Sequence, residues 1–267
     1  DSPSTRAISC AGQTPRYTRF SVDGVAIPDS SGLNSDGLPS RRSPIPFDAI
    51  GQFQAKVAPY DVREGNFQGG AINIVLRSGT NAFQGTGFFA YSADELNGKK
   101  TKAGPGVPTG KVTLPDYTYK NFGAEISGPI IKDTLFFMIA GERLRASQPI
   151  PEGTAENNAG IAIPTLSQAQ VDLVSQIAKS RYSYDTGGVL NQNGDSDDRL
   201  VAKLDWNISD NHRASVTYTY AKDSIALVQN AFTTVPYGLG LASNAYVMTN
   251  RLHTGVVQLN SDWSDSF

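Results

Sequence analysis

Residues 47–91 read FDAIGQFQAKVAPYDVREGNFQGGAINIVLRSGTNAFQGTGFFAY, a glycine-punctuated segment that runs directly into short aromatic strands. Gly65, Gly69 and Gly70 bracket an aromatic residue, and glycine permits bends and close backbone approach that a Cβ atom would obstruct. Residues 72–77 alternate with the period of a half-buried strand, and residues 78–81 predict a turn. An ordinary hairpin of a soluble β-sandwich would explain this local pattern equally well.

The bulk composition narrows the class of protein. The chain has 267 residues, enough for one or two domains, with 39% hydrophobic residues and a mean hydropathy of −0.29. No run approaches the ~18–20 apolar residues that a membrane helix needs. The 23 basic and 25 acidic residues nearly balance, which gives no electrostatic reason to expect nucleic acid as a partner.

Four later segments alternate polar and apolar residues with period two. A low mean hydropathy is compatible with a membrane barrel, because only alternate residues face lipid while the others face a polar lumen. The expected lipid-facing sets are Phe122, Ala124, Ile126 and Ile130; Leu200, Ala202, Leu204, Trp206 and Ile208; Ala214, Val216, Tyr218 and Tyr220; and Gly255, Val257, Leu259 and Trp263. Residues 135–139 are continuously apolar, so the facing of their strand stays open.

The connections between candidate strands alternate in length. The strands lie near residues 84–93, 117–130, 134–146, 199–208, 212–222 and 250–263. Outer-membrane barrels have short periplasmic turns and long extracellular loops, whereas the links of a soluble sandwich are usually short on both sides. The turns at 131–133 and 209–211 are therefore predicted to face the periplasm, and residues 94–116, 147–198 and 223–249 are predicted to lie outside the cell.

Two further local patterns carry expectations. Trp206 and Trp263 each precede a predicted turn, where an indole suits the membrane–water boundary, although packing on the end of a sandwich core is an open alternative. Ser167 and Gln170 form a capping box, and the apolar residues after them predict a helix through about Arg181. We expect this helix to pack in a folded surface loop rather than to contact ligand.

Catalytic and metal-binding interpretations find little support. Residues 85–90 fit a dinucleotide fingerprint superficially, but their strand-like aromatics contradict the required turn into a helix. Residues 191–198, NQNGDSDD, are rich in oxygen ligands but lack the EF-hand pattern, so a solvated acidic loop is the preferred interpretation. His212 and His253 lack partners at metal-binding spacing, and no Ser-His-Asp arrangement or carboxylate pair is recognisable.

The single cysteine has a similarly limited role. Cys10 alone excludes an intramolecular disulfide framework and a multi-cysteine metal site within this chain. A small semi-buried thiol, or half of a disulfide whose partner lies elsewhere, is favoured over a reactive thiol. We expect no catalytic residue, cofactor or metal.

Three segments, together with the turn at residues 22–24, carry a resemblance to a known family. They are residues 67–73 (FQGGAIN), residues 77–85 (RSGTNAFQG) and residues 122–143 (FGAEISGPIIKDTLFFMIAGER). This combination resembles the junction between plug and barrel in TonB-dependent outer-membrane receptors, especially the Oar-like subgroup. The resemblance covers most of residues 20–145 and fades in the loops beyond.

The resemblance implies a fold and a domain organisation. It implies an all-β membrane protein: part of a large antiparallel outer-membrane β-barrel of about 22 strands with an N-terminal plug, to which the pattern adds a short helix in an extracellular loop. Residues 1–80 would be the C-terminal part of the plug, and residues 81–267 about six barrel strands with long extracellular loops. We expect the receptor to continue beyond residue 267. Five motif positions have expected structural rather than ligand-binding roles: Gly69, Gly70, Asn73, Gly79 and Asn81.

The resemblance also implies a function, a gated receptor in the bacterial outer membrane that admits a scarce substrate to the periplasm. Its partners would be outer-membrane lipid, a TonB-type energy-coupling complex whose contact segment is absent here, and an unknown extracellular substrate, with no nucleic acid. Siderophore, oligosaccharide, peptide and cobalamin stay open as substrates. Two alternatives remain: a surface-binding or adhesion protein on the same barrel, and a secreted soluble β-sandwich that binds glycans.

Overall fold

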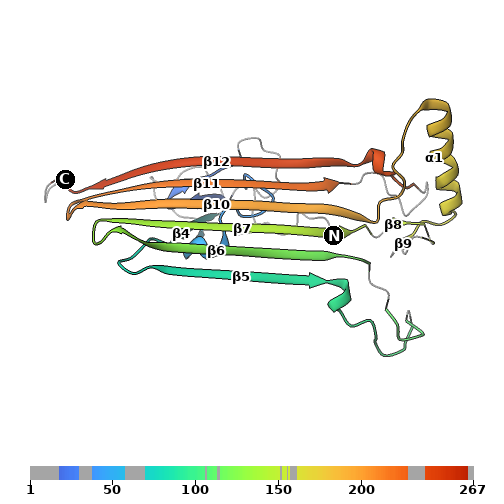
Figure 1. The fold of residues 1–267 in the computed structure, drawn as a ribbon, viewed down its shortest axis with the longest axis horizontal. Helices are drawn as coiled ribbons and strands as arrows, with labels where there is room; N and C mark the ends of the chain where they lie inside the picture. The colour runs from blue at the N-terminus through green and yellow to red at the C-terminus, as the bar shows by residue number, and fades with distance from the viewer. Residues whose placement is uncertain are drawn as a thin grey trace.

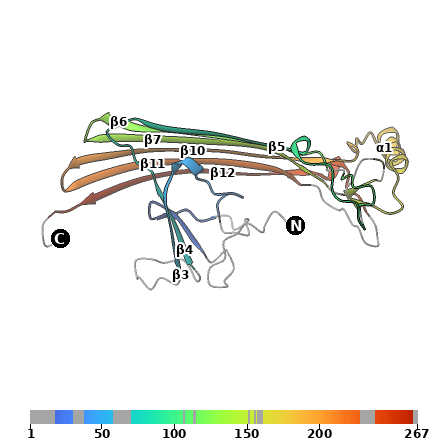
Figure 2. The same cartoon turned by 90° about the horizontal axis from the view of Figure 1, so that it is seen from below.

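The computed structural model describes residues 18–29, 38–57, 70–105, 107–112, 115–150, 152–154, 156, 161–227 and 238–263. These residues form two main sheets, one of long strands and one of shorter N-terminal strands (Figures 1 and 2). In the part of the chain so described, no helix is both long enough and apolar enough to cross a membrane. Cys10 and Gly69 lie outside the described residues.

The long sheet contains six antiparallel strands in the order β12-β11-β10-β7-β6-β5, so that strands following one another along the chain lie side by side (Figure 1). Period-two alternation favours this arrangement, because most of these strands have one apolar and one largely polar face. The exception is β7, which is apolar on both faces over residues 135–139. All six predicted strands are present. Their bounds are β5 Gln84–Ala93, β6 Thr118–Ile131, β7 Leu135–Pro149, β10 Gln192–Ser209, β11 His212–Leu227 and β12 Tyr246–Ser261.

The connections also alternate as predicted. Short turns join β6 to β7 and β10 to β11 at one end of the long sheet, which we call the turn end. The longer connections gather at the opposite end, the loop end. They contain the 3-10 helices η4 (Asp94–Leu96) and η6 (Ala242–Asn244), the two-residue strands β8 (Glu152–Gly153) and β9 (Ile161–Ala162), and the helix α1 (Gln168–Tyr182) (Figure 1).

One sequence-based prediction is wrong. Residues 191–198 were expected to form a solvated acidic loop, but β10 begins at Gln192 and pairs with both β7 and β11 along this stretch. Asp195 and Asp197 are buried. The oxygen-rich composition suggested a loop, yet the aspartates at 195 and 197 continue the period-two polar face of the strand that follows.

The N-terminal sheet is smaller, with strands in the order β2-β1-β4-β3. Its strands are β1 (Arg19–Val22), β2 (Val25–Ala26), β3 (Ile50–Val57) and β4 (Gly70–Leu76), and the 3-10 helix η3 (Phe47–Ala49) leads into β3. Asp23 and Gly24, both with positive φ, form the predicted two-residue turn between β1 and β2; aspartate and glycine tolerate this conformation best. Figure 2 shows this sheet standing on one face of the long sheet.

The hydrophobic core lies between the two sheets. Val22, Ile45, Ile74 and Leu76 from the N-terminal region pack in one cluster with buried residues of the long sheet. The contributions of the long sheet are Met138, Ala140 and Val201. Met138 and Ala140 also resolve the facing of β7, because they face the N-terminal sheet whereas Ile139 is exposed on the other side.

The opposite face of the long sheet is apolar and exposed. Leu204 and Val216 are 42% and 46% exposed, whereas their neighbours Lys203 and Thr217 are 8% and 6% exposed. The predicted alternation is therefore confirmed, with the apolar side chains pointing outward and the polar ones pointing toward the N-terminal sheet. An apolar outward face is what a barrel presents to lipid.

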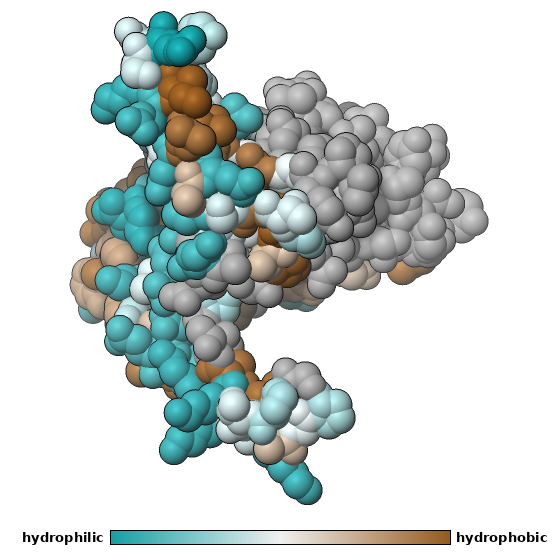
Figure 3. Space-filling model, turned by 90° about the vertical axis from the view of Figure 1, so that its right-hand side faces the viewer, coloured by the Kyte–Doolittle hydropathy of each residue, from teal (hydrophilic) through white to brown (hydrophobic). Residues whose placement is uncertain are grey.

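The helix α1 begins with the predicted capping box. The Ser167 side chain accepts a hydrogen bond from the Gln170 backbone, and the Gln170 side chain accepts one from the Ser167 backbone. Among the apolar residues of the helix, Val171 is buried, but Leu173, Val174 and Ile177 are exposed. Figure 3 shows the resulting apolar stripe on α1 at the loop end. The helix thus packs in a loop through only part of its apolar face.

Candidate functional site at the interface of the two sheets

Charged residues hold the N-terminal region against the inner face of the long sheet near the loop end. Arg41 and Arg42 follow one another in the segment before η3, and both contact Asp195 on β10. The Arg41 Nη2 atom lies 2.5 Å from Asp195 Oδ1, and the Arg42 Nη2 atom lies 2.6 Å from Asp195 Oδ2. Arg41 Nε also donates to Asp223 on β11 at 3.1 Å. The two arginines therefore bridge two strands of the long sheet.

A second layer of polar contacts surrounds this cluster. Arg199 lies 2.8 Å from Asp197 and 3.5 Å from Glu142, and the backbone amide of Phe47 donates to Glu142 Oε2 at 3.0 Å. Asn250 donates to Asp223 at 3.1 Å. Within this cluster, three arginines face four carboxylates, and each charged group has at least one oppositely charged partner.

The charge state of Arg42 follows from these contacts. Burial alone would lower the pKa of its guanidinium group, but the hydrogen bond and Coulombic attraction from Asp195, helped by Asp197 and Asp223, raise that pKa above its ordinary value. Arg42 therefore stays charged at physiological pH. Separating it from Asp195 would leave charges without their partners in a largely buried site, which is costly.

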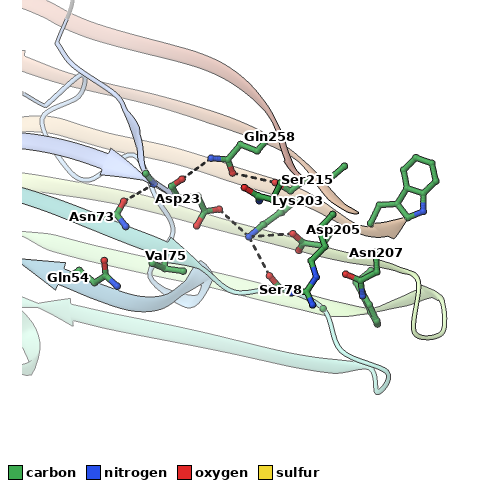
Figure 4. Close-up of a pocket in the computed structure, with 17 residues that line it drawn as sticks. Asp23, Gln54, Asn73, Val75, Ser78, Lys203, Asp205, Asn207, Ser215 and Gln258 are labelled. Atoms are coloured by element: carbon green, nitrogen blue, oxygen red, sulfur yellow. Dashed lines mark hydrogen bonds and ion pairs between the residues drawn. The ribbon is translucent and has the colours of Figure 1, made fainter. Parts of the chain in front are cut away.

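A second set of contacts lies closer to the turn end and centres on Lys203 of β10. The Lys203 Nζ atom lies 3.1 Å from Asp23 Oδ2 and 3.6 Å from Asp205 Oδ1, and it donates to Ser78 Oγ at 3.4 Å (Figure 4). Gln258 of β12 donates to the backbone oxygen of Asp23 at 2.9 Å. One lysine thus joins the β1–β2 turn, the segment after β4 and the long sheet.

Asp23 also organises its own sheet. Its Oδ1 atom accepts a hydrogen bond from the backbone amide of Leu76 at 2.9 Å, at the end of β4. Asn73 accepts hydrogen bonds from Ser21 Oγ and from the Gly24 amide, at 3.0 and 2.9 Å. The turn that contacts Lys203 is therefore rigidly attached to β4.

An open cavity of about 660 Å³ adjoins these residues. Its polar lining includes Asp23, Gln54, Lys203, Asp205 and Gln258 (Figure 4). It lies between the N-terminal sheet and the inner face of the long sheet, toward the turn end. Charged and amide groups lie beside apolar ones such as Val75 and Phe136 in its lining.

The segment between the two sheets is fixed to the turn end. A Cβ atom on Gly79 would lie 2.6 Å from the carbonyl oxygens of both Gly128 and Phe137, so the backbone passes too close for any side chain. Asn81 Nδ2 donates to Asp133 Oδ1, and the Asp133 amide donates to Asn81 Oδ1 at 2.8 Å. Asp133 lies in the β6–β7 turn with a positive φ. Gly79 and Asn81 thus attach the segment to the hairpin formed by β6 and β7.

The five motif residues predicted from sequence are only partly brought together. Gly79 and Asn81 lie in the same segment, Asn73 lies on β4 beside the cavity, and Gly70 is buried at the start of β4. Sequence reasoning missed Arg41, Arg42 and the role of Lys203. Part of the evidence for the arginines was in the sequence. Asp195, Asp197 and Lys203 are separated by even numbers of residues, so their side chains lie on the same inward face of β10, where carboxylates need cationic partners.

The two histidines and the possible metal-binding groups are the other candidates for a role at this interface. In the described ranges, no group of three or more His, Cys, Asp and Glu side chains is arranged to hold a metal ion. The His212 ring packs against the Trp263 ring at a tilt of 55°, with 5.1 Å between ring centroids, and His253 shares a 2.8 Å hydrogen bond with Tyr218. Both histidines lie on the long sheet, away from the interface.

Comparison with known proteins agrees with this geometry. Residues 75–188 match the family model described as an outer membrane beta barrel domain. The chain is 32% identical over 133 residues to the TonB-dependent transporter Oar of Myxococcus xanthus; the match covers 49% of this chain and 12% of that protein. The matched segment therefore spans about an eighth of the length of this relative.

Solved structures share the fold. The outer membrane transporter YddB from Escherichia coli aligns with a TM-score of 0.62 at 11% identity, over 97% of this chain and 31% of that one. The siderophore receptor PirA from Acinetobacter baumannii aligns with a TM-score of 0.54 at 16% identity, over 94% and 30%. The fold is that of part of an outer-membrane β-barrel, and the protein is located in the bacterial outer membrane.

Proposed function

We propose that this segment of a bacterial outer-membrane β-barrel, which is similar to TonB-dependent receptors, belongs to a gated, energy-coupled transporter that admits a scarce substrate to the periplasm. In this proposal residues 1–80 are the C-terminal part of the plug, and residues 81–267 are the first strands of the barrel wall. The loop end faces the outside of the cell, and the turn end faces the periplasm.

The observation that carries the proposal is the way the N-terminal sheet is attached to the inner face of the long sheet. Its attachments include ion pairs around Asp195 and around Lys203. A plug in a barrel must seal the lumen and yet move. When a lumen opens, ion pairs can exchange their protein partners for water, which offsets part of the cost of separating the sheets and exposing the apolar core between them.

The polar cavity beside Lys203 supports the same proposal. It lies alongside the N-terminal sheet, where a small displacement of that sheet would enlarge it toward the turn end. Force applied to the plug by a TonB-type complex would then break the contact of Lys203 with Asp23 and widen a polar path. The residues of this chain would bind, exclude or release solute, with no covalent step.

A surface-binding or adhesion protein is the second candidate, and the exposed stripe on α1 favours it. Leu173, Val174 and Ile177 are exposed at the loop end, and exposed apolar patches often mark interaction sites. The soluble glycan-binding sandwich is less well supported, because a second sheet would have to cover the apolar outward face of the long sheet. In the described structure that face carries exposed side chains such as Leu204 and Val216.

An uptake assay with the full-length receptor tests the proposal. Cells expressing it are given labelled ferric siderophore, cobalamin, maltooligosaccharide or oligopeptide, with and without a protonophore, and surface binding is measured separately from periplasmic accumulation. We expect one probe to bind and to accumulate only when the proton-motive force is intact. Strong binding of a probe without accumulation in energised cells would favour adhesion.

A variant links the uptake assay to the interface. Lys203→Met removes the cation that Asp23 and Asp205 share, so the plug should seal less well and a large hydrophilic antibiotic should enter faster. Lys132→Met is the matched control, because Lys132 is exposed in the β6–β7 turn. Equal antibiotic entry in the two variants, at matched surface expression, would remove Lys203 from the sealing contact.

A further inference from the structure

The outward face of the long sheet carries a band of positive charge near the loop end. Strand pairing places Phe122, Arg143, Asp198, Lys222 and Arg251 in one row across β6, β7, β10, β11 and β12. The next row toward the loop end runs from Tyr91 through Lys120 and Arg145. These two rows contain five cations and one carboxylate. We call the five cations the basic patch: Lys120, Arg143, Arg145, Lys222 and Arg251.

The single carboxylate is shared. Asp198 lies 2.7 Å from Arg145 and 3.4 Å from Arg143. The Arg143 side chain remains 56% exposed. Lys120 lies over the Tyr91 ring at 5.9 Å, so it has an aromatic contact and no carboxylate in the described structure. Four positive charges on this face are therefore uncompensated.

Cross-strand register makes this surplus unfavourable for the sheet alone. Lys120 is directly opposite Arg145 between β6 and β7, and Lys222 is directly opposite Arg251 between β11 and β12. Like charges at directly opposite positions destabilise a sheet. Arg145 is compensated by Asp198, but Lys222 and Arg251 form no ion pair among the described residues, so this surface can accept an external anion.

The level of the patch identifies the source of that anion. From Asp198, at the level of the patch, to Trp206 near the turn end, eight residue steps along β10 span about 26 Å at ~3.3 Å per residue. Because the strands of outer-membrane barrels tilt by about 35–45°, this length corresponds to a height of about 19–22 Å, slightly less than their ~25 Å apolar band. Between the two residues the outward side chains of β10 are Leu200, Ala202 and Leu204, in an apolar belt. The patch thus lies where the belt ends, beside Tyr91 and Phe122, which is the level of lipid headgroups.

We propose that the basic patch binds phosphate groups of phosphorylated lipids in the outer leaflet of the surrounding membrane. Arginine presents a planar set of donors that matches phosphate, and lysine supplies a compact charge. A phosphate between Lys222 and Arg251, and another between Lys120 and Arg145, converts each repulsive pair into two attractive contacts. The apolar belt below the patch takes the acyl chains of the same lipids, so headgroup and tail contacts reinforce one another.

Thermal unfolding of the full-length receptor in neutral detergent tests this proposal. The receptor is titrated with lipid A, with lipid A from which the phosphates have been removed, or with inorganic phosphate. Of these three, we expect only intact lipid A to raise the Tm strongly. The double variant Lys222→Gln, Arg251→Gln should bind lipid A about tenfold more weakly or worse, from the loss of about two lipid-facing cations.

The control removes the same number of charges elsewhere. Lys179→Gln with Arg181→Gln changes two exposed cations on α1, at the loop end and outside the patch, and should respond to lipid A as the wild type does. A patch variant that responds like this control would overturn the proposal. So would an equal Tm increase with dephosphorylated lipid, or with inorganic phosphate alone.

The Tm measured without lipid distinguishes lipid binding by these cations from a merely structural role. Because the double variant removes a repulsive pair, it should unfold in neutral detergent at the same Tm as wild type or higher. A structural role for these cations predicts the opposite, a lower Tm without lipid. Lys120→Gln with Arg145→Gln provides an independent second test at the other repulsive pair, with the same expected loss of the response to lipid A.

Discussion

Gly79 is the residue with the least space for change. Two carbonyl oxygens, from β6 and β7, lie where its Cβ atom would be. Gly79→Val should therefore force the segment away from the β6–β7 hairpin and cost about 1–3 kcal/mol of stability, as overpacking usually does. The fraction of full-length receptor that resists unfolding in SDS is the measurement.

Gly255→Val is the control for this substitution. Gly255 lies on the outward face of β12, and no atom lies within 4 Å of the position that its Cβ would take. Valine there should be tolerated. Equal resistance to SDS in the two variants would mean that the segment around Gly79 adjusts without cost.

Asp195 is the most heavily shared carboxylate of the interface. Asp195→Ala removes the nearest carboxylate of both Arg41 and Arg42 while they stay largely buried, and it leaves Arg41 with Asp223 at 3.1 Å and Arg42 with Asp197 at 3.7 Å. Removing one side of a buried ion pair costs about 3–5 kcal/mol, and the remaining carboxylates should keep the loss toward the lower end of that range. Urea unfolding of the full-length receptor in liposomes should show this loss, whereas the exposed Asp210→Ala in the β10–β11 turn should change little. A similar midpoint for both variants would contradict the assignment.

At the scale of the element, β10 has two faces with opposite requirements. Leu204→Arg places a charge on the outward face and should destabilise the inserted receptor by roughly 2–4 kcal/mol if the site lies near the bilayer midplane. Lys203→Arg keeps a cation on the inward face, within reach of Asp23, and should be much milder. Folding into liposomes measures both variants. Equal effects would remove the assignment of the two faces.

The helix α1 depends on its capping box more than on packing, because most of its apolar face is exposed. Ser167→Ala should destabilise the helix by about 1 kcal/mol, since it removes the side-chain oxygen that accepts a hydrogen bond from the Gln170 amide. Hydrogen exchange of the amides in residues 168–182 should accelerate. Ser180→Ala, near the other end, should leave exchange at the first turn unchanged, and acceleration by both variants alike would show that the cap is dispensable.

At the scale of the whole molecule, the long sheet has two unpaired edges in the described structure, at β5 and β12. It also has an exposed apolar face. Both features favour aggregation in water. We expect the isolated chain not to form a stable water-soluble monomer, and analytical ultracentrifugation without detergent is the measurement. A compact monomer with a cooperative melting transition would favour the soluble sandwich instead.

The fold class was readable from the sequence because its determinants are local. Period-two alternation specifies which side chains share a face, and the lengths of the connections follow directly from the chain. The six strands, the two turns of the long sheet and the capped helix are therefore present as predicted. The facing of β7 was not readable, since Leu135–Ile139 is apolar on both faces; Met138 became an inward residue only because the N-terminal sheet covers it.

The interface depended on tertiary structure. Arg41 lies 154 positions from Asp195 in sequence, and Lys203 lies 125 positions from Ser78, so no local pattern relates them. The acidic segment at 191–198 had the composition of a loop, and only pairing with β7 and β11 made it a strand whose buried aspartates could meet the arginines. By itself the sequence determined the strands and their faces, because these depend on near neighbours. Tertiary structure decided which charges meet across the two sheets, because that depends on how distant segments are brought together.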